Sequence, residues 1–215
     1  MITTLFFDIG GVVLSNGWDR DARRRAAERF ALDFDEFDER HAAVVGDFET
    51  GRMDLDTYLE KTVFFERRAF APADFKAFML AQSHEDAAPL ALVRQLRQGG
   101  RYRLAAINNE SLELNRHRIE RFRLRECFSL FFSSCFVRLL KPNPAIYRLA
   151  LDVTQTPPQD AFMVDDRAIN VEAARRVGMH AIHFHDVDQL RASLADLGVD
   201  VARSPEPANP ESTSA

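Results

Sequence analysis

Carboxylates, amides and a lysine recur along the chain in short clusters, and side chains of these types could together bind a cation and a phosphate group. The clusters are Asp8 with Gly10 and Gly11, then Asn108, Asn109 and Glu110, then Ser133, Ser134 and Lys141, and finally Asp165, Asp166, Arg167 and Asn170. A single Asp after a strand is often only a helix cap. Each cluster, however, follows a short apolar run, so a fold that aligned those runs would gather the clusters in one place.

The charge balance of these clusters favours a bound cation. Two carboxylates about 4 Å apart repel by roughly 4 kcal/mol at an effective dielectric constant of ~20, so Asp8, Asp165 and Asp166 would crowd one another. Lys141 supplies one positive charge. A hard divalent ion would supply the rest, and Mg²⁺ prefers one or two carboxylates together with water and phosphate. The alternative is that Lys141 and Arg167 neutralise the carboxylates as plain ion pairs.

The apolar runs ahead of the clusters have the length and composition of buried strands. The expected strands are Ile2–Phe7, Tyr102–Ile107, Phe128–Phe132, Ala161–Val164 and Ala181–Phe184. From Pro89 onward these runs alternate with helical segments, which predicts a doubly wound parallel α/β sheet with helices on both faces. Ligands bind at the carboxyl ends of the strands in such sheets, which is where the clusters fall.

Between the first two strands the chain has only helical patterns, with breakers at Gly46, Gly51 and Pro72. The expected helices there are Arg23–Phe30, Phe34–Val45, Leu55–Phe65 and Ala73–Leu80. We therefore expect a core domain made of residues 1–15 and 86–200 and a small helical cap domain, residues 16–85, inserted after the first strand. Residues 201–215 are rich in Pro, Ser, Glu and Asn and are expected to form a disordered tail.

Four segments, taken in order, resemble the motifs of the haloacid dehalogenase (HAD) superfamily. Asp8–Val13 resembles the nucleophile motif, Leu104–Asn109 the second motif, Lys141–Tyr147 the lysine motif and Val164–Asn170 the acidic motif. The resemblance covers about Ile2 to Leu197. It implies a five-stranded core of order 5-4-1-2-3 with a helical cap after the first strand, in the phosphatase-like subset with a D-x-G-G-V nucleophile motif.

The resemblance also implies a role for each matching residue. Asp8 would be an aspartyl nucleophile, steadied by Lys141. The residues around the phosphoryl group would be Gly10, Gly11, Asn108, Asn109 and Lys141, with Asn108 as a hydrogen-bond donor. The Mg²⁺ ligands would be Asp8, the carbonyl of Gly10 and Asp166, with Asp165 and Asn170 in support. A carboxylate that attacks phosphorus divides hydrolysis into two easier displacements.

Two positions depart from the pattern of the family's phosphatases. Gly10 stands where most of them carry a second Asp that acts as general acid and then as base, and Asn108 stands where Ser or Thr is usual. General acid–base help is typically worth ~10²–10⁴-fold in rate. A substrate with a good leaving group, such as an anomeric sugar phosphate, would need less of it. Otherwise water, a cap residue, Asp19 or Glu110 could carry the proton, although Asp19 as a helix cap and Glu110 as a first-turn residue are the simpler interpretations.

Composition limits the partners and the cellular location to be expected. The formal net charge of −5 disfavours general binding to nucleic acid. The two cysteines, Cys127 and Cys135, give neither a disulfide framework nor a zinc pattern and are expected to be buried free thiols. No apolar run approaches the ~20 residues needed to span a bilayer, and the N-terminus lacks the pattern of a signal peptide. We expect a cytoplasmic monomer or homodimer.

The leading functional hypothesis is a Mg²⁺-dependent phosphatase acting on a small phosphorylated metabolite. A protein that kept the fold for binding or regulation and lost efficient turnover is the rival, motivated by Gly10 and Asn108. A dehalogenase is a weaker alternative, because the family's dehalogenases carry Tyr at the position of Gly10. In the insertion, Arg23 is expected on a solvated helix face, and Trp18 is a candidate for the pocket lining.

Overall fold

The fold is built around one parallel sheet of five strands in the order β3-β2-β1-β4-β5. The computed structural model describes residues 1–201, so the predicted tail lies outside the described residues apart from its first position. The strands are β1 (Thr4–Phe7), β2 (Arg103–Asn108), β3 (Leu130–Ser133), β4 (Ala161–Asp165) and β5 (His180–His183). This order is the predicted one written from the other edge, so the predicted fold class is confirmed.

Strand β1 lies at the centre of the sheet, and its register sets the position of the site. Phe7 lies opposite Ala106 of β2 and opposite Val164 of β4. The residues that follow these strands therefore come out side by side at the carboxyl edge. Alternate side chains of β1 face opposite sides of the sheet, as the two-residue repeat of a strand requires.

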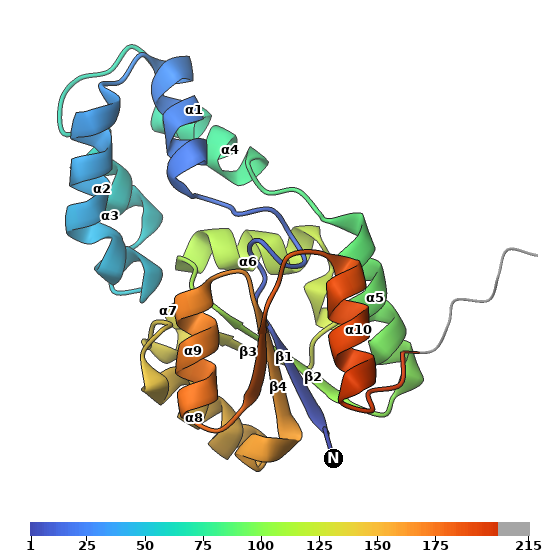
Figure 1. Ribbon diagram of the computed structural model, residues 1–215. Coiled ribbons are helices and arrows are strands. Elements are labelled where there is room, and N and C mark those ends of the chain that lie inside the picture. Colours follow the sequence, from blue (N-terminus) through green and yellow to red (C-terminus); the bar gives the residue numbers. More distant parts are fainter. Residues whose placement is uncertain (202–215) are drawn as a thin grey trace, which may run out of the picture.

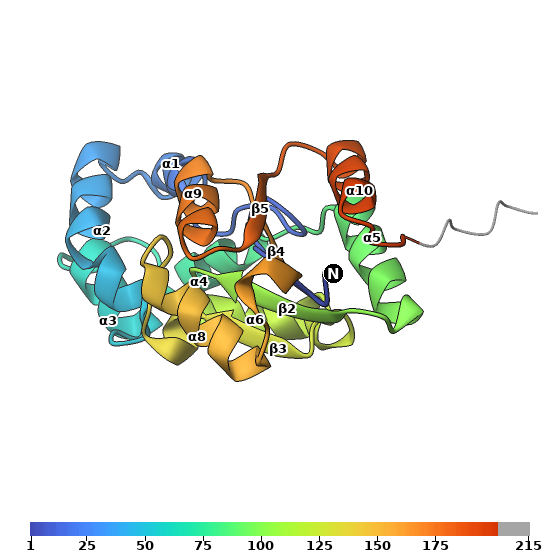
Figure 2. The same ribbon diagram turned by 60° about the horizontal axis from the view of Figure 1, so that its bottom comes forward.

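Helices cover both faces of this sheet (Figures 1 and 2). Leu5 and Phe7 pack with residues of α5 (Ala87–Gly99), α6 (Leu112–Arg121) and α10 (Val187–Asp196). Phe6 packs on the other side with residues of α8 (Pro144–Thr154) and α9 (Ala168–Arg176). The remaining short segments are α7 (Ser134–Val137), η1 (Leu124–Glu126) and η2 (Pro158–Asp160). Burial of every residue of β1 fits its central place between two helical layers.

The segment between β1 and α5 forms a separate helical lobe, at the upper left of Figure 1. It contains α1 (Arg20–Phe30), α2 (Phe34–Glu49), α3 (Leu55–Thr62) and α4 (Pro72–Ala81). The first three begin at aspartate caps, Asp19, Asp33 and Asp54, whose carboxylates accept from backbone N–H groups of the first turn. The lobe has its own apolar core, rich in aromatic rings such as those of Phe37, Tyr58 and Phe75. A helical insertion after the first strand was the prediction, and we call this lobe the cap.

Gly46 does not interrupt the second cap helix, so its prediction as a breaker was wrong. Helix α2 continues through it to Glu49. A helical Gly costs about 1 kcal/mol relative to Ala, which the packing of Phe37, His41 and Phe48 on the buried side of α2 outweighs. Gly51 does follow the helix end and has a φ of 66°. The other predicted ends differ from the observed ones by a few residues.

Both thiols are buried and free, as predicted. Among residues 1–201, no helix is both long enough and apolar enough to cross a membrane.

Candidate active site

Asp8 leaves the end of β1 with its carboxylate held in place by short contacts. Its backbone N–H donates to the carbonyl of Val164 at 2.8 Å. The Ile9 N–H donates to Asp8 Oδ1 at 2.7 Å, and Lys141 Nζ lies 2.7 Å from Asp8 Oδ2. The residue is 7% exposed. The predicted nucleophile is therefore fixed, and its exposed portion faces a pocket.

Lys141 lies between Asp8 and Asp165 and donates to both. Its Nζ is 2.7 Å from Asp165 Oδ2. The second oxygen of Asp165 accepts from the backbone N–H of Arg167 at 3.0 Å and from Asn170 Nδ2 at 2.9 Å. Asp165 is fully buried with hydrogen bonds to both of its oxygens. It serves to orient Lys141 and Asn170.

Asp166 completes a cluster of carboxylates that carries more negative charge than Lys141 can balance. Ligand oxygens of Asp8, Asp165 and Asp166 lie within 4.8 Å of one another. Burial, opposed by Lys141 and reinforced by the other two carboxylates, raises the pKa of Asp8 to about 7. The sequence also allowed Lys141 and Arg167 to neutralise these carboxylates as plain ion pairs. Lys141 does pair with Asp8 and Asp165, but within residues 1–201 neither Asp166 nor Arg167 forms an ion pair.

The donor atoms at this cluster fit a hard divalent cation. They are all oxygens, and Asn170 Oδ1 is buried with no hydrogen-bond partner within the described chain. Gly11 lets the backbone pass close by: its φ is 71°, and a Cβ there would lie 2.2 Å from Asp166 Oδ2. A side chain at position 11 would therefore displace a carboxylate of the cluster.

The neighbourhood of Gly10 is filled by other residues. A Cβ on Gly10 would lie 3.1 Å from Asn16 Oδ1 and 3.7 Å from the Arg118 guanidinium. Arg118 Nη1 in turn donates to Glu110 Oε2 at 2.8 Å, in an ion pair that is almost fully buried. Glu110 Oε1 accepts from the backbone N–H of Ser111. Glu110 precedes α6 and is an ion-pair partner, and Asp19 caps α1 as the simpler interpretation had it.

Asn108, the last residue of β2, and Asn109, which follows it, have side chains in different surroundings. Asn108 is 2% exposed and does not line the pocket. Its Nδ2 donates to Asn115 Oδ1 at 3.0 Å, and its Oδ1 accepts from Ser133 Oγ at 2.7 Å. Asn109 does line the pocket and exchanges two hydrogen bonds with the backbone of Lys141, at 2.9 and 3.0 Å. The core fold thus brings together the predicted site residues, except that the Asn108 amide is engaged elsewhere.

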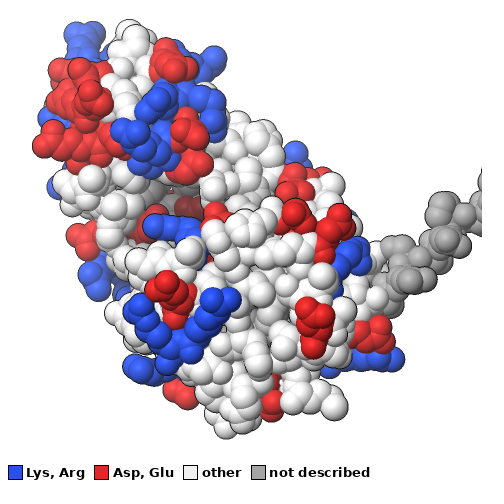
Figure 3. All heavy atoms as spheres, viewed as in Figure 1, with Lys and Arg blue, Asp and Glu red and all other residues white. Residues whose placement is uncertain are grey.

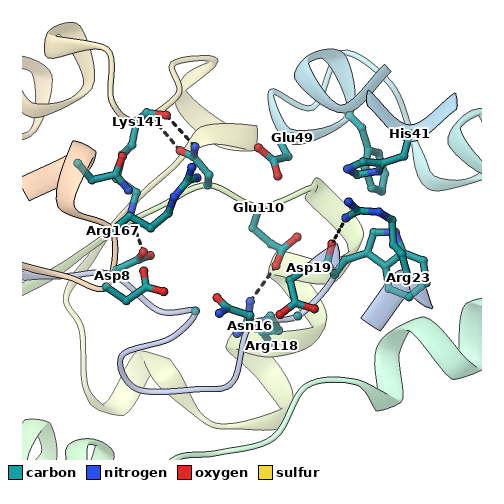
Figure 4. Close-up of a pocket in the computed structure, with 17 residues that line it drawn as sticks. Asp8, Asn16, Asp19, Arg23, His41, Glu49, Glu110, Arg118, Lys141 and Arg167 are labelled. Atoms are coloured by element: carbon teal, nitrogen blue, oxygen red, sulfur yellow. Dashed lines mark hydrogen bonds and ion pairs between the residues drawn. The ribbon is translucent and has the colours of Figure 1, made fainter. Parts of the chain in front are cut away.

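A pocket of about 360 Å³ separates this edge of the sheet from the cap. Figure 3 shows the hollow between the two lobes, and Figure 4 its lining. The cap side contributes Trp18, Asp19, Arg23, His41, Phe48 and Glu49. Trp18 lines the pocket, as the sequence suggested. The prediction that Arg23 lies on a solvated face was wrong, because Arg23 is 8% exposed and pairs with Asp38 at 2.7 Å. The sequence pattern did not predict His41 and Glu49 in the lining, since no local signal marks a helical residue that faces another lobe.

Hydrogen bonds link three cap residues in a chain. Trp18 Nε1 donates to the Tyr58 hydroxyl at 2.9 Å, and that hydroxyl lies 2.9 Å from His41 Nδ1. An indole N–H can only donate, so the Tyr58 oxygen accepts the hydrogen bond from Trp18. Burial, and then the charge of Arg23, lower the pKa of His41 to about 4 against the opposing effect of Asp38. His41 therefore stays neutral near pH 7.

Glu49 brings a further carboxyl group into the pocket from the last position of α2. Burial and the neighbouring Glu110 raise its pKa to about 7, while Arg167, Lys141 and Arg23 oppose the rise.

The fold and the pocket define a class of protein, the HAD-type α/β hydrolases. The chain belongs to the haloacid dehalogenase-like hydrolase family, whose model matches residues 2–178. The predicted family is thereby confirmed.

Individual relatives are distant. Flavin mononucleotide hydrolase 1 of Arabidopsis thaliana is 32% identical over 83 residues, 39% of this chain and 34% of that protein. Drimenol cyclase of Aspergillus calidoustus is 25% identical over 92% of this chain and 37% of that protein. The chain thus matches only about a third of the length of these two curated relatives.

A solved HAD family enzyme from Bacteroides thetaiotaomicron has the same fold. It superposes with a TM-score of 0.76 at 18% identity, over 88% of this chain and 98% of that one. The same enzyme has also been solved in complex with magnesium and inorganic phosphate, with a TM-score of 0.74.

Proposed function

We propose that the protein is a Mg²⁺-dependent phosphatase that hydrolyses a small phosphorylated metabolite through an aspartyl-phosphate on Asp8. The observation that carries the proposal is the placement of the Asp8 carboxylate at the pocket wall, held by Lys141 and the Ile9 N–H next to the unbalanced carboxylate of Asp166. A pocket of about 360 Å³ suits a small-molecule substrate.

In this proposal one oxygen of Asp8 attacks phosphorus. The new bond from Asp8 to phosphorus forms as the ester bond breaks, and water then cleaves the acyl phosphate to release inorganic phosphate. Lys141 faces both the nucleophile and the incoming negative charge, so it orients the first and stabilises the second. Asn109 fixes the Lys141 backbone and so helps to place its side chain.

The cation would be held by Asp8, Asp166 and the carbonyl of Gly10, and Asp165 and Asn170, whose buried Oδ1 has no hydrogen-bond partner within the described chain, would support it. When bound, Mg²⁺ neutralises the carboxylates and the spread charge of the transferring phosphoryl group. The magnesium and phosphate in the Bacteroides structure support this choice. The printed activity of the Arabidopsis relative, hydrolysis of flavin mononucleotide, supports a phosphate ester as substrate.

The test is release of inorganic phosphate from a panel of phosphorylated metabolites and sugar phosphates in the presence of Mg²⁺. We expect activity in the wild type, its loss with EDTA and its loss in Asp8→Asn. Equal activity of wild type and Asp8→Asn would remove Asp8 as the nucleophile. If no ester is turned over but vanadate, a phosphate analogue, binds tightly, the regulatory alternative motivated by Gly10 is favoured instead.

A further inference from the structure

The position of Gly10 leaves the proposed reaction without its usual proton carrier, and the pocket contains few replacements. The carboxyl groups that line it belong to Asp8, Asp19, Glu49, Glu110 and Asp166. Asp8 and Asp166 lie in the cation cluster. Asp19 accepts from the first turn of α1, and Glu110 pairs with Arg118. Within residues 1–201, the Glu49 carboxyl forms no hydrogen bond or ion pair, which leaves it free to act on a substrate.

Glu49 is on the cap, yet contacts with the core domain fix its backbone. Ser134 Oγ donates to the Glu49 carbonyl at 2.6 Å. Two residues later, Gly51 is so close to the core that a Cβ on it would lie 2.7 Å from the Cys135 carbonyl oxygen. Figure 1 shows the end of α2 reaching toward α7, where Ser134 begins the helix. The backbone of Glu49 is therefore anchored to the core domain at the point where the two lobes touch.

The placement of Glu49 suits a group that serves the leaving oxygen. In phosphoryl transfer the attacking and leaving oxygens lie roughly in line on opposite sides of phosphorus. A proton donor for the leaving group must therefore face Asp8 from across the pocket. Figure 4 shows Glu49 on the cap side of the pocket and Asp8 on the core side.

We propose that Glu49 is the general acid and base of this enzyme, a catalytic residue that takes over from the cap the proton transfers that Gly10 cannot perform. This inference rests on the proposed function. In the first step the bond from Asp8 to phosphorus forms, the bond from phosphorus to the leaving oxygen breaks, and the Glu49 proton moves to that oxygen to give an alcohol. In the second step water attacks phosphorus, Asp8 is released, and the Glu49 carboxylate takes the water proton.

The environment of Glu49 matches both roles. A general acid and base is most effective with a pKa near the working pH. Burial and Glu110 raise the pKa of Glu49 to about 7, against the positive charges of Arg167, Lys141 and Arg23. The other titratable group nearby on α2, His41, is neutral at this pH because its pKa is lowered.

The test compares esters that differ in leaving group. Alkyl phosphates such as glycerol 2-phosphate need a proton on the departing oxygen, whereas p-nitrophenyl phosphate does not. In Glu49→Gln we expect kcat for glycerol 2-phosphate to fall on the order of 10²–10³-fold. With p-nitrophenyl phosphate the pre-steady-state burst of nitrophenol should keep its wild-type rate, while the subsequent turnover slows because water lacks its base.

The pH profile is an independent readout. In wild type, kcat for glycerol 2-phosphate should fall as the pH rises above about 7 and Glu49 loses its proton. That decline should be absent in Glu49→Gln. The matched control is Glu39→Gln, an exposed acid on the same helix, which should retain wild-type rates on both esters.

Two results would overturn the inference in distinguishable ways. If Asp8→Asn is inactive but Glu49→Gln hydrolyses glycerol 2-phosphate at the wild-type rate, the phosphatase proposal stands and Glu49 is not its proton carrier. If Asp8→Asn is as active as wild type, both proposals fall together. An equal loss of burst rate on both esters in Glu49→Gln would assign it to substrate binding and also contradict the inference.

Discussion

The two walls of the pocket are built in different ways. On the core side, Asp8 directly follows β1, Asp165 ends the neighbouring strand β4, and Lys141 bridges the two carboxylates at 2.7 Å on each side. On the cap side, His41 and Glu49 come from within and from the end of one helix, and their positions depend on how the cap packs. The core wall holds its charges in mutual contact, whereas the cap wall presents a neutral histidine and an unpaired carboxyl.

This difference predicts how each wall responds to substitution. A reaction that needs a nucleophile, a lysine and a cation site requires fixed distances, which strand ends in one sheet supply. In our proposals the cap wall surrounds the remainder of the substrate and supplies Glu49 as the proton carrier, and its residues pack on a separate apolar core. Removing a charge from the core wall should therefore lower the free energy of unfolding more than a change on the cap wall does.

The largest expected effect is that of Lys141→Met. The Lys141 side chain is 1% exposed and lies between two buried carboxylates, so its removal leaves them uncompensated. We expect a loss of about 3–5 kcal/mol in the free energy of unfolding in metal-free buffer, together with loss of phosphatase activity. Urea denaturation measures the first. The control is Lys61→Met, at an exposed position on α3, which should change the free energy of unfolding by less than about 0.5 kcal/mol. An equally small change for Lys141→Met would contradict the claim that the core wall depends on its paired charges.

The next effect tests the cap wall by pH. The unfolded chain binds a proton at His41 near pH 6.5, whereas the folded protein keeps it neutral down to about 4. The contribution of neutral His41 to the free energy of unfolding is therefore complete above pH 6.5 and is lost as the pH falls. The loss reaches about 3 kcal/mol near pH 4. Urea denaturation of wild type and His41→Gln between pH 7 and 4 should show their difference shrink as the pH falls. His180→Gln, at an exposed histidine, should leave the wild-type pH dependence intact.

Gly11→Ala tests the close approach on the core wall. The left-handed φ of 71° and the 2.2 Å from a Cβ to Asp166 Oδ2 both oppose a side chain. We expect destabilisation on the order of 2 kcal/mol and weaker Mg²⁺ binding by isothermal titration calorimetry, because Asp166 must move. Unchanged Mg²⁺ affinity in a folded variant would show that Asp166 does not need its present position.

Gly46→Ala makes the same substitution in the cap as Gly11→Ala makes at the core site, and it has the smallest expected effect on stability. Gly46 lies within α2 with nothing within 4 Å of a Cβ. The substitution should stabilise the protein by about 0.5–1 kcal/mol, seen as a rise in the thermal midpoint with no change in kcat. Destabilisation would mean that α2 needs flexibility at this position. The same kind of mutation is thus expected to have opposite effects on stability at Gly11, beside the carboxylate cluster, and at Gly46, within a cap helix.

The sequence was most informative where neighbours along the chain share a task. Apolar runs followed by Asp8, Asn109 or Asp165 predicted both the strands and the edge that carries the site, because parallel strands in register expose their ends together. The same local reasoning failed at Gly46, where helix packing outweighs a poor helix former, and at Asn108, whose amide bonds to Asn115 and Ser133.

By itself, then, the sequence determined the α/β sheet, the helical insertion and the polar residues at the carboxyl edge, since these follow from short-range patterns and strand order. Only the tertiary structure decided which cap residues face that edge. Arg23, His41 and Glu49 carry no local mark of a pocket, because a helical residue looks inward or outward according to how its lobe packs. For the same reason, only the packing of α2 beside α7 reveals that the Glu49 carboxyl lines the pocket.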